Sequence, residues 1–262
     1  MEQQINTIEH NHQHSHEEEH SCGCGSGGCG SHGGNGEKSE LPIKFQILRA
    51  GDKVVEFGSG TGNDCFAVSQ IIGTEGSVIG IDFSEENINI ARNFQDQLKI
   101  SNVEFKSGKI ENAPLPNDYA DILYCNSAFN LHEDKQKIAD EMYRVCNHNG
   151  LSCVTDFIVF HDIPEGLRKD AADYADSIAG AESPEKFMEY FRKTGFGNVD
   201  IIEINKVHLP DDLFEKHLNA EQIKNYKDIE SDQGIFKVTL IAEKPTTCAP
   251  ETCCGNHEKH MN

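Results

Sequence analysis

The fold is decided by one stretch of the sequence, Val54-Val55-Glu56-Phe57-Gly58-Ser59-Gly60-Thr61-Gly62-Asn63-Asp64-Cys65-Phe66. An apolar run ends in an acid, three glycines follow at alternate positions, and a helical pattern then begins. This pattern predicts a strand, a tight turn and a helix N-terminus, where backbone N–H groups face a nucleotide-type ligand. The dinucleotide fingerprint requires its third glycine at position 63, where Asn63 stands, so a pyrophosphate is not indicated. Glu56 offers an acceptor for an ammonium group instead. A tight turn that binds nothing is the alternative.

Strand and helix patterns alternate through most of the chain. The alternation predicts an α/β fold, a doubly wound, seven-stranded Rossmann-like sheet with a C-terminal helical and antiparallel extension. Strands are predicted at 53–57, 77–82, 103–105, 121–125, 151–157, 198–204 and 234–242. Helices are predicted at 43–48, 64–72, 85–98, 135–146, 165–178 and 184–194, and the partly helical insertion 208–232 is expected to cover a substrate.

Asp82 closes the second predicted strand. A carboxylate at that point can accept hydrogen bonds from both hydroxyls of a ribose lying across the strand ends. The alternative role is an N-cap for the next helix, but Ser84 is the better cap, which leaves Asp82 free for the ribose. Ligands of such sheets bind at the C-terminal ends of the strands, so Glu56, Asp82 and Asn126 are expected to meet there.

Composition limits the classes of partner. The 262 residues include 44 acids and 23 Lys or Arg, a formal net charge of −21, which argues against a nucleic-acid partner. No apolar run approaches the roughly 20 residues that span a membrane, and no secretory signal is visible, so we expect a cytoplasmic protein with a small-molecule substrate. In that setting the ten cysteines are expected to be thiols or metal ligands rather than disulfides.

The two ends of the chain are rich in His and Cys and poor in apolar residues. Such segments cannot bury enough surface to offset their ordering entropy, so 1–38 and 246–262 are predicted to be disordered tails. Imidazoles and thiols suit soft metals, which makes metal or metalloid binding one hypothesis and plain solvated tails the other. The candidate tail ligands are Cys22, Cys24, Cys29, Cys253 and Cys254.

The residues from Leu41 to Phe160 resemble a class I S-adenosylmethionine-dependent methyltransferase. Within that superfamily, Gly58-Ser-Gly-Thr-Gly-Asn-Asp-Cys65-Phe66 is similar to the arsenite methyltransferases, as are Gly108-Lys-Ile-Glu111 and Cys125-Asn126-Ser-Ala-Phe-Asn130-Leu131. The resemblance implies S-adenosylmethionine as cofactor, a methyltransferase domain at 39–160 that binds it, and a C-terminal part at 161–245 carrying the insertion. The implied cofactor-binding residues are Glu56, Gly58, Ser59, Gly60, Gly62, Asp82, Phe83, Ile110, Glu111 and Asn126.

The same resemblance implies methyl transfer to trivalent arsenic, with Cys65 as catalytic metalloid ligand and a thiol reductant as partner. Cys65 falls in the first turn of a helix, where the macrodipole is expected to favour the thiolate. Its alternative is a buried apolar residue, the expected role of Cys125, Cys146 and Cys153. Ser177 stands where the family has a second cysteine, and a hydroxyl is a poor ligand for a soft metalloid.

Three functions therefore remain open from the sequence. The first is methylation of arsenite or its thiol conjugates, with tail thiols completing the site begun by Cys65. The second is an O-, N- or C-methyltransferase for a small molecule, of the quinone-biosynthesis type. The third is a metal-binding protein built on a methyltransferase body without turnover.

Overall fold

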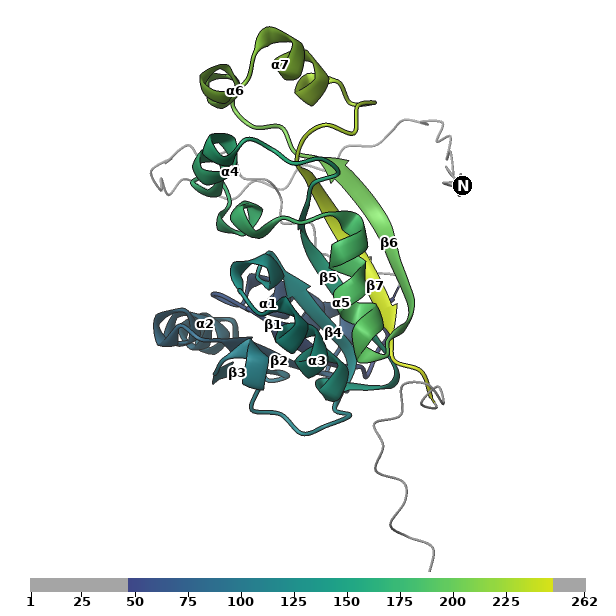
Figure 1. Ribbon diagram of the computed structural model, residues 1–262. Helices are drawn as coiled ribbons and strands as arrows, with labels where there is room; N and C mark the ends of the chain where they lie inside the picture. Colours follow the sequence, from purple (N-terminus) through teal and green to yellow (C-terminus); the bar gives the residue numbers. More distant parts are fainter. Residues whose placement is uncertain (1–46, 247–262) are drawn as a thin grey trace, which may run out of the picture. The chain divides into compact units, whose positions relative to one another are not determined.

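The computed structural model describes residues 47–246, all within one compact unit, Ser39–Asn262. Their framework is one seven-stranded sheet in the order β3-β2-β1-β4-β5-β7-β6 (Figure 1). The strands are β1 (Lys53–Phe57), β2 (Ser77–Asp82), β3 (Val103–Ser107), β4 (Ala120–Asn126), β5 (Cys146–Ile158), β6 (Gly197–Lys206) and β7 (Phe236–Glu243).

The first five strands are parallel, and β7 runs antiparallel between β5 and β6. The chain therefore returns along β7 to the end of the sheet at which the parallel strands begin, where Glu243 pairs with Leu151. The order reverses beside β1, which lies between β2 and β4. In a doubly wound sheet this switch point opens a crevice for a ligand. The predicted doubly wound fold is confirmed.

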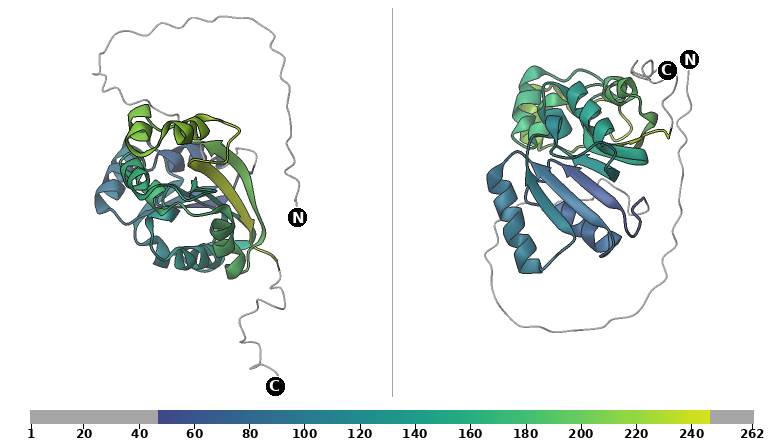
Figure 2. Two further views of the ribbon diagram at one scale, coloured as in Figure 1. Left: turned by 45° about the horizontal axis from the view of Figure 1, so that its top comes forward. Right: turned by 90° about the horizontal axis from the view of Figure 1, so that it is seen from below.

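Helices cover both faces of the sheet (Figures 1 and 2). One face carries α1 (Asn63–Ile72) and α2 (Glu85–Leu98), packed on buried residues such as Val54, Val78 and Phe105. The other carries α3 (Lys135–Val145) and α5 (Pro184–Thr194), which pack on Val55, Ile79 and a cluster of phenylalanines. Strands buried on both faces read as continuous apolar runs, as Val54–Val55 and Val78–Ile79 do.

A smaller helical layer extends beyond the C-terminal end of β5. It comprises α4 (Glu165–Ala172), the 3₁₀ helix η3 (Asp176–Gly180), α6 (Asp211–His217) and α7 (Ala220–Lys227) (Figure 1). These elements have their own apolar core, which includes Leu167, Ile178, Phe214 and Tyr226. The partly helical insertion predicted at 208–232 is confirmed as α6 and α7.

Some boundaries differ from the prediction. The helix expected over 165–178 is broken, because α4 ends at Ala172 and η3 turns Ser177 and Ile178 into the interior. The strand expected from 151 starts at Cys146, because Ala120 pairs with Cys146 before a register shift. Of the short helix predicted over 43–48, only the last two residues are described, and they are not helical. The predicted tails 1–38 and 246–262, apart from Thr246, lie outside the described residues.

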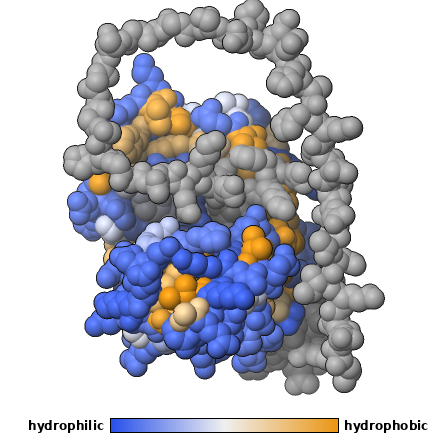
Figure 3. Space-filling model, turned by 90° about the horizontal axis from the view of Figure 1, so that it is seen from above, coloured by the Kyte–Doolittle hydropathy of each residue, from blue (hydrophilic) through white to orange (hydrophobic). Residues whose placement is uncertain are grey.

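Within residues 47–246, no helix combines the length and apolarity needed to cross a membrane. Seen from the side of α6 and α7, the described surface is mostly hydrophilic, with apolar residues exposed in small separate groups (Figure 3).

Candidate active site

The Gly-rich turn between β1 and α1 is fixed against the end of β2. The backbone N–H groups of Gly58 and Ser59 donate to the carbonyl of Ile81, at 2.8 and 3.0 Å. The N–H of Gly60 donates to Oδ2 of Asp82 at 2.8 Å. The two predicted motifs, on different strands, therefore form one unit.

Glycine is required at positions 60 and 62 of this turn for different physical reasons. Gly62 has φ +85°, and a Cβ there would collide with the ring of Phe105, so this position serves the packing of α1. Gly60 has φ +51°, and a Cβ there would meet nothing within 4 Å. The backbone at Gly60 is thus bare and accessible, as a closely approaching ligand requires.

Asp82 is buried, and its carboxylate is more occupied than expected. Oδ1 accepts from the N–H of Ser84 at 2.9 Å and from Nδ2 of Asn87 at 3.4 Å, while Oδ2 holds Gly60. Ser84 does cap α2, with Asn87 N as donor to its hydroxyl. The expectation that Asp82 is free was wrong, because the cap leaves the N–H of Ser84 itself for Asp82. A carboxylate has about four acceptor positions, so the capacity for a hydroxyl remains.

The other predicted cofactor residues also lie at the strand ends. The loop after β3 is joined to β2 by the bond from Gly108 N to Asp82 O, at 2.9 Å, and leads into the 3₁₀ helix η1 (Ile110–Asn112), which holds Ile110 and Glu111. Ile110 is buried in the core. Asn126, at the end of β4, donates to Oδ2 of Asp64 at 3.0 Å. Phe83 projects from the site with 74 % of its surface exposed.

Cys65 lies in a buried polar cluster beneath the turn. Its Sγ donates to Oε2 of Glu56 at 2.8 Å, and the hydroxyl of Tyr124 lies 3.5 Å from the same oxygen. Burial, reinforced by the Glu56 carboxyl, holds the pKa of Cys65 well above its ordinary value. Burial and Asp64 likewise raise the pKa of Glu56. The expectation that the helix N-terminus favours a Cys65 thiolate was wrong, because desolvation outweighs the dipole.

The structure does not bring a set of thiols together in the part it describes. Cys65, Cys125, Cys146 and Cys153 are all buried and form no disulfide with one another, so the expected core role of the last three is confirmed. Ser177 is also buried, in η3. Among residues 47–246 no group of three His, Cys, Asp or Glu side chains could hold a metal. The tail ligands Cys22, Cys24, Cys29, Cys253 and Cys254 lie outside the described residues, so their role stays a prediction.

A polar cluster that the sequence analysis missed lies beside β5. Asp156, fully buried, accepts from Asn130 N at 2.9 Å, from Asn130 Nδ2 at 3.1 Å and from Phe157 N at 2.9 Å. Burial raises the pKa of Asp156 to about 6. These bonds fasten the segment after β4, which follows directly on Asn126, to the end of β5. The available signal was a single acid, Asp156, in the second half of the strand predicted over 151–157.

The arrangement at the ends of β1, β2 and β4 fits S-adenosylmethionine. The bare backbone at Gly60 admits a close ligand, and Asp82 retains acceptor capacity for one ribose hydroxyl. Ser59 Oγ and Glu111 Oε2 are buried without hydrogen-bond partners among the described residues, and both lie in segments predicted to bind the cofactor. The exposed ring of Phe83 offers a stacking face for a base.

Residues 48–195 match the methyltransferase domain family, and the chain belongs to that family. Its cofactor is S-adenosylmethionine, as predicted. Its relatives include the arsenite methyltransferase of Halobacterium salinarum, 30% identical over 206 residues, which are 78% of this chain and 49% of that protein. The arsenite methyltransferase of Homo sapiens is 29% identical over 172 residues, 62% of this chain and 46% of that protein. The chain thus spans about half the length of the curated relatives it matches.

Solved structures agree on the fold. An arsenic(III) S-adenosylmethionine methyltransferase from Chlamydomonas reinhardtii has a TM-score of 0.59 and 23% identity, with 75% of this chain and 64% of that chain covered. The YcgJ protein of Bacillus subtilis has a TM-score of 0.59 and 22% identity, with 76% of this chain and 94% of that chain covered.

Proposed function

We propose that the chain transfers a methyl group from S-adenosylmethionine to trivalent arsenic that arrives as arsenite or a thiol conjugate. The observation that carries the proposal is the Asp64–Cys65 pair in the first turn of α1, directly after the Gly-rich turn. The Cys65 thiol donates a hydrogen bond to the carboxyl of Glu56. The similarity to arsenite methyltransferases over most of the chain supports the same substrate.

The cofactor supplies an activated methyl group on a sulfonium, so the protein has to provide position and a dry site. Gly60, Asp82, Glu111 and Asn126 are the proposed holders of the cofactor. The nucleophile is the lone pair of arsenic, and thiolate ligands fix that atom in place.

Glu56 gives Cys65 a route to become a ligand despite its raised pKa. When the Cys65 sulfur replaces another thiolate on arsenic, the Cys65 thiol proton passes to Glu56 and then to the departing thiolate, which leaves as a thiol. A carboxylate whose pKa is raised by burial is a better proton acceptor than an ordinary one. The exchange conserves charge: one S–H bond breaks, one forms, and the number of As–S bonds is unchanged. The first turn of α1 has to open for arsenic to reach this buried thiol.

A methylation assay with arsenite and excess thiol tests the proposal. Cys65→Ser is expected to lower kcat/KM for arsenic at least tenfold, about 1.4 kcal/mol, because the hydroxyl is a poor arsenic ligand. Cys146→Ser is the matched control, because Cys146 is an equally buried thiol at the opposite ends of the strands. Full activity of Cys65→Ser would remove Cys65 from the mechanism. No methylated arsenic from the wild type with any thiol would reject the substrate.

The second candidate is methylation of a small organic molecule. It is favoured by the absence, among residues 47–246, of a group of three ligands that could hold a metal, together with a relative named as a ubiquinone/menaquinone biosynthesis C-methyltransferase in Vibrio vulnificus. That protein is 30% identical over 171 residues, 57% of this chain. Turnover of a hydroxylated aromatic acceptor that is unchanged in Cys65→Ser would favour this candidate. Binding of arsenic and cofactor without turnover of either substrate would favour the metal-binding hypothesis.

A further inference from the structure

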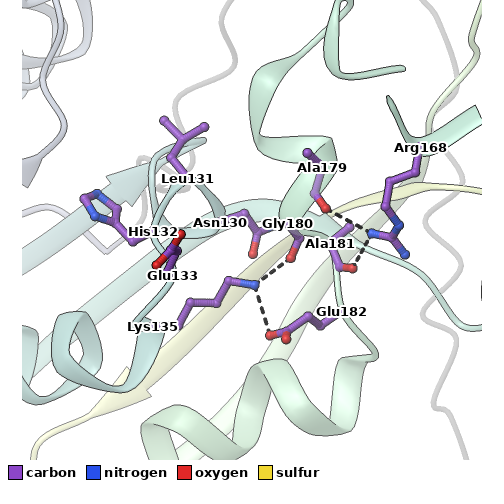
Figure 4. A pocket seen from close by; sticks show the side chains of 10 residues that line it. All are labelled: Asn130, Leu131, His132, Glu133, Lys135, Arg168, Ala179, Gly180, Ala181 and Glu182. Carbon is purple, nitrogen blue, oxygen red and sulfur yellow. Dashed lines mark hydrogen bonds and ion pairs between the residues drawn. The ribbon is translucent and has the colours of Figure 1, made fainter. Parts of the chain in front are cut away.

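A pocket of about 390 Å³ lies between the segment after β4, helix α4 and η3 (Figure 4). It is distinct from the Gly-rich turn but shares the segment that begins at Asn126. Its lining is charged: Lys135 and Arg168 are the cations, and Glu133 and Glu182 are the acids. The lining charges balance, in a chain whose formal net charge is −21. A ligand with one positive and one negative end matches such a lining.

The cations are held in place by backbone carbonyls. Nζ of Lys135, which is buried, donates to Gly180 O at 2.6 Å and pairs with Glu182 at 3.0 Å. Arg168 donates through Nη1 to Ala179 O at 3.2 Å and to Ala181 O at 2.7 Å (Figure 4). Both bonds of Arg168 to described residues use Nη1, so Nε and Nη2 remain for a carboxylate. Arginine presents these two donors in the geometry that a carboxylate accepts.

The acceptors in the pocket are also incompletely used. Asn130 is buried and lines the pocket, and its Oδ1 has no hydrogen-bond partner among residues 47–246. Its Nδ2 is committed to Asp156 and Phe157 O, which fixes the orientation of the amide. A buried acceptor without a donor is costly, and a ligand ammonium would satisfy it. Glu133, which is exposed at the rim, adds a negative charge for the same ammonium.

We propose that this pocket binds the amino-acid zwitterion of the thiol that carries arsenic to the enzyme. The carboxylate binds Arg168, the ammonium binds Asn130 Oδ1 and Glu133, and the thiol extends toward the strand ends. The proposal rests on the proposed function for its thiol, while the zwitterion site follows from the pocket alone. It gives the protein a means to select its thiol partner by both charged ends.

Four small thiols separate the contributions. Cysteine carries both charges, cysteamine only the ammonium, mercaptoacetate only the carboxylate, and mercaptoethanol neither. With arsenite as acceptor, the KM for cysteine is expected to be about tenfold below that for mercaptoethanol, with the other two between them. The four thiols are compared at equal thiolate concentrations, because their thiol pKa values differ.

Two variants test the residues. Arg168→Met is expected to raise the KM for cysteine about tenfold and to leave that for mercaptoethanol unchanged, whereas a merely structural loss would affect both. Arg168→Lys is expected to recover part of the preference. Glu133→Gln is expected to raise the KM for cysteine two- to threefold, because the site is partly screened by solvent. Lys169→Met and Glu86→Gln are the matched controls, being exposed and outside the pocket.

A binding measurement without arsenic keeps the two proposals distinguishable. L-Serine, which has the same charged ends and no thiol, is expected to shift the backbone amide signals of 179–182 in an NMR titration of the full chain. The shifts should be absent in Arg168→Met and present in Lys169→Met. Shifts without methylated arsenic would reject the proposed function and retain the zwitterion site. Equal KM values for all four thiols, with no shifts, would overturn the inference and leave the proposed function standing.

Discussion

Asp156 provides a direct test of the electrostatics at the end of β5. Burial raises the pKa of this carboxyl from 3.8 to about 6. The native state therefore binds the proton more tightly than the unfolded chain, and the stabilisation present at low pH is lost as pH rises through 6. This rise in pKa corresponds to about 3 kcal/mol in total, of which about 1 kcal/mol falls between pH 5 and 7.

The measurement is urea unfolding at pH 5, 6 and 7 for the wild type and Asp156→Asn. The variant is expected to be less stable at pH 5, because its amide places a donor against the donors of Asn130 and Phe157. The wild type should lose about 1 kcal/mol more than the variant between pH 5 and 7. Glu56 also has a raised pKa and lowers the stability of both proteins as the pH rises. The contribution of Asp156 is therefore the difference between the two proteins in how the free energy of unfolding changes with pH. Glu86→Gln is the control for removing an exposed acid. Equal pH slopes in wild type and Asp156→Asn would refute the reasoning.

Four further predictions concern the Gly-rich turn, the cofactor and the tails. Gly60→Ala is expected to cost about 1 kcal/mol of stability from its positive φ but to weaken S-adenosylmethionine binding at least tenfold by calorimetry. Gly62→Ala should lower the stability by about 2 kcal/mol or more, because its Cβ meets an aromatic ring. A larger stability loss for Gly60→Ala than for Gly62→Ala would contradict this assignment. Asp82→Ala should weaken cofactor binding more than tenfold, since it removes an acceptor and frees the turn at Gly60; unchanged heat of binding would exclude Asp82 from the site. Deletion of 1–38 is expected to reduce arsenic affinity while cofactor affinity holds, whereas deletion of 247–262 should change neither; identical behaviour of all three proteins would remove the tails from the mechanism.

Most of the fold could be predicted because the strands near the cofactor are short and apolar and end in distinctive residues. The runs at Val54–Val55 and Val78–Ile79 are buried on both faces, and glycine or a capping residue follows each strand. The predicted α2 agrees with the observed helix because Ser84 marks its start. The break after α4 was missed because it depends on a distant contact. Gly180 packs so closely on the carbonyl of Asn130 that a Cβ would collide with it.

Glu56, Asp82 and Asn126 could be predicted to meet because each is a polar residue at the end of an apolar strand, while the resemblance implied the rest of the cofactor set. Their mutual bonds were not predicted, since spacing along the chain cannot reveal that Asp82 holds Gly60 or that Asn126 holds Asp64. The state of Cys65 was misjudged for a physical reason. A helix N-terminus was visible in the sequence, whereas the buried carboxyl of Glu56 opposite the thiol was not.

The antiparallel course of β7 sets where the C-terminal thiols start. Thr246 bonds to Asn149, so the chain leaves from the edge at which the parallel strands begin, opposite the Gly-rich turn. The span of β7 alone is about 24 Å, and the seven residues from Thr246 to Cys253 reach about 24 Å at full extension. Cys253 would therefore reach the level of the cofactor only with this segment fully extended, and β4 and β5 would still lie between β7 and β1. Seventeen residues lie between Cys29 and Ile47, a contour length of up to about 60 Å, so chain length alone sets no such restriction on the N-terminal thiols.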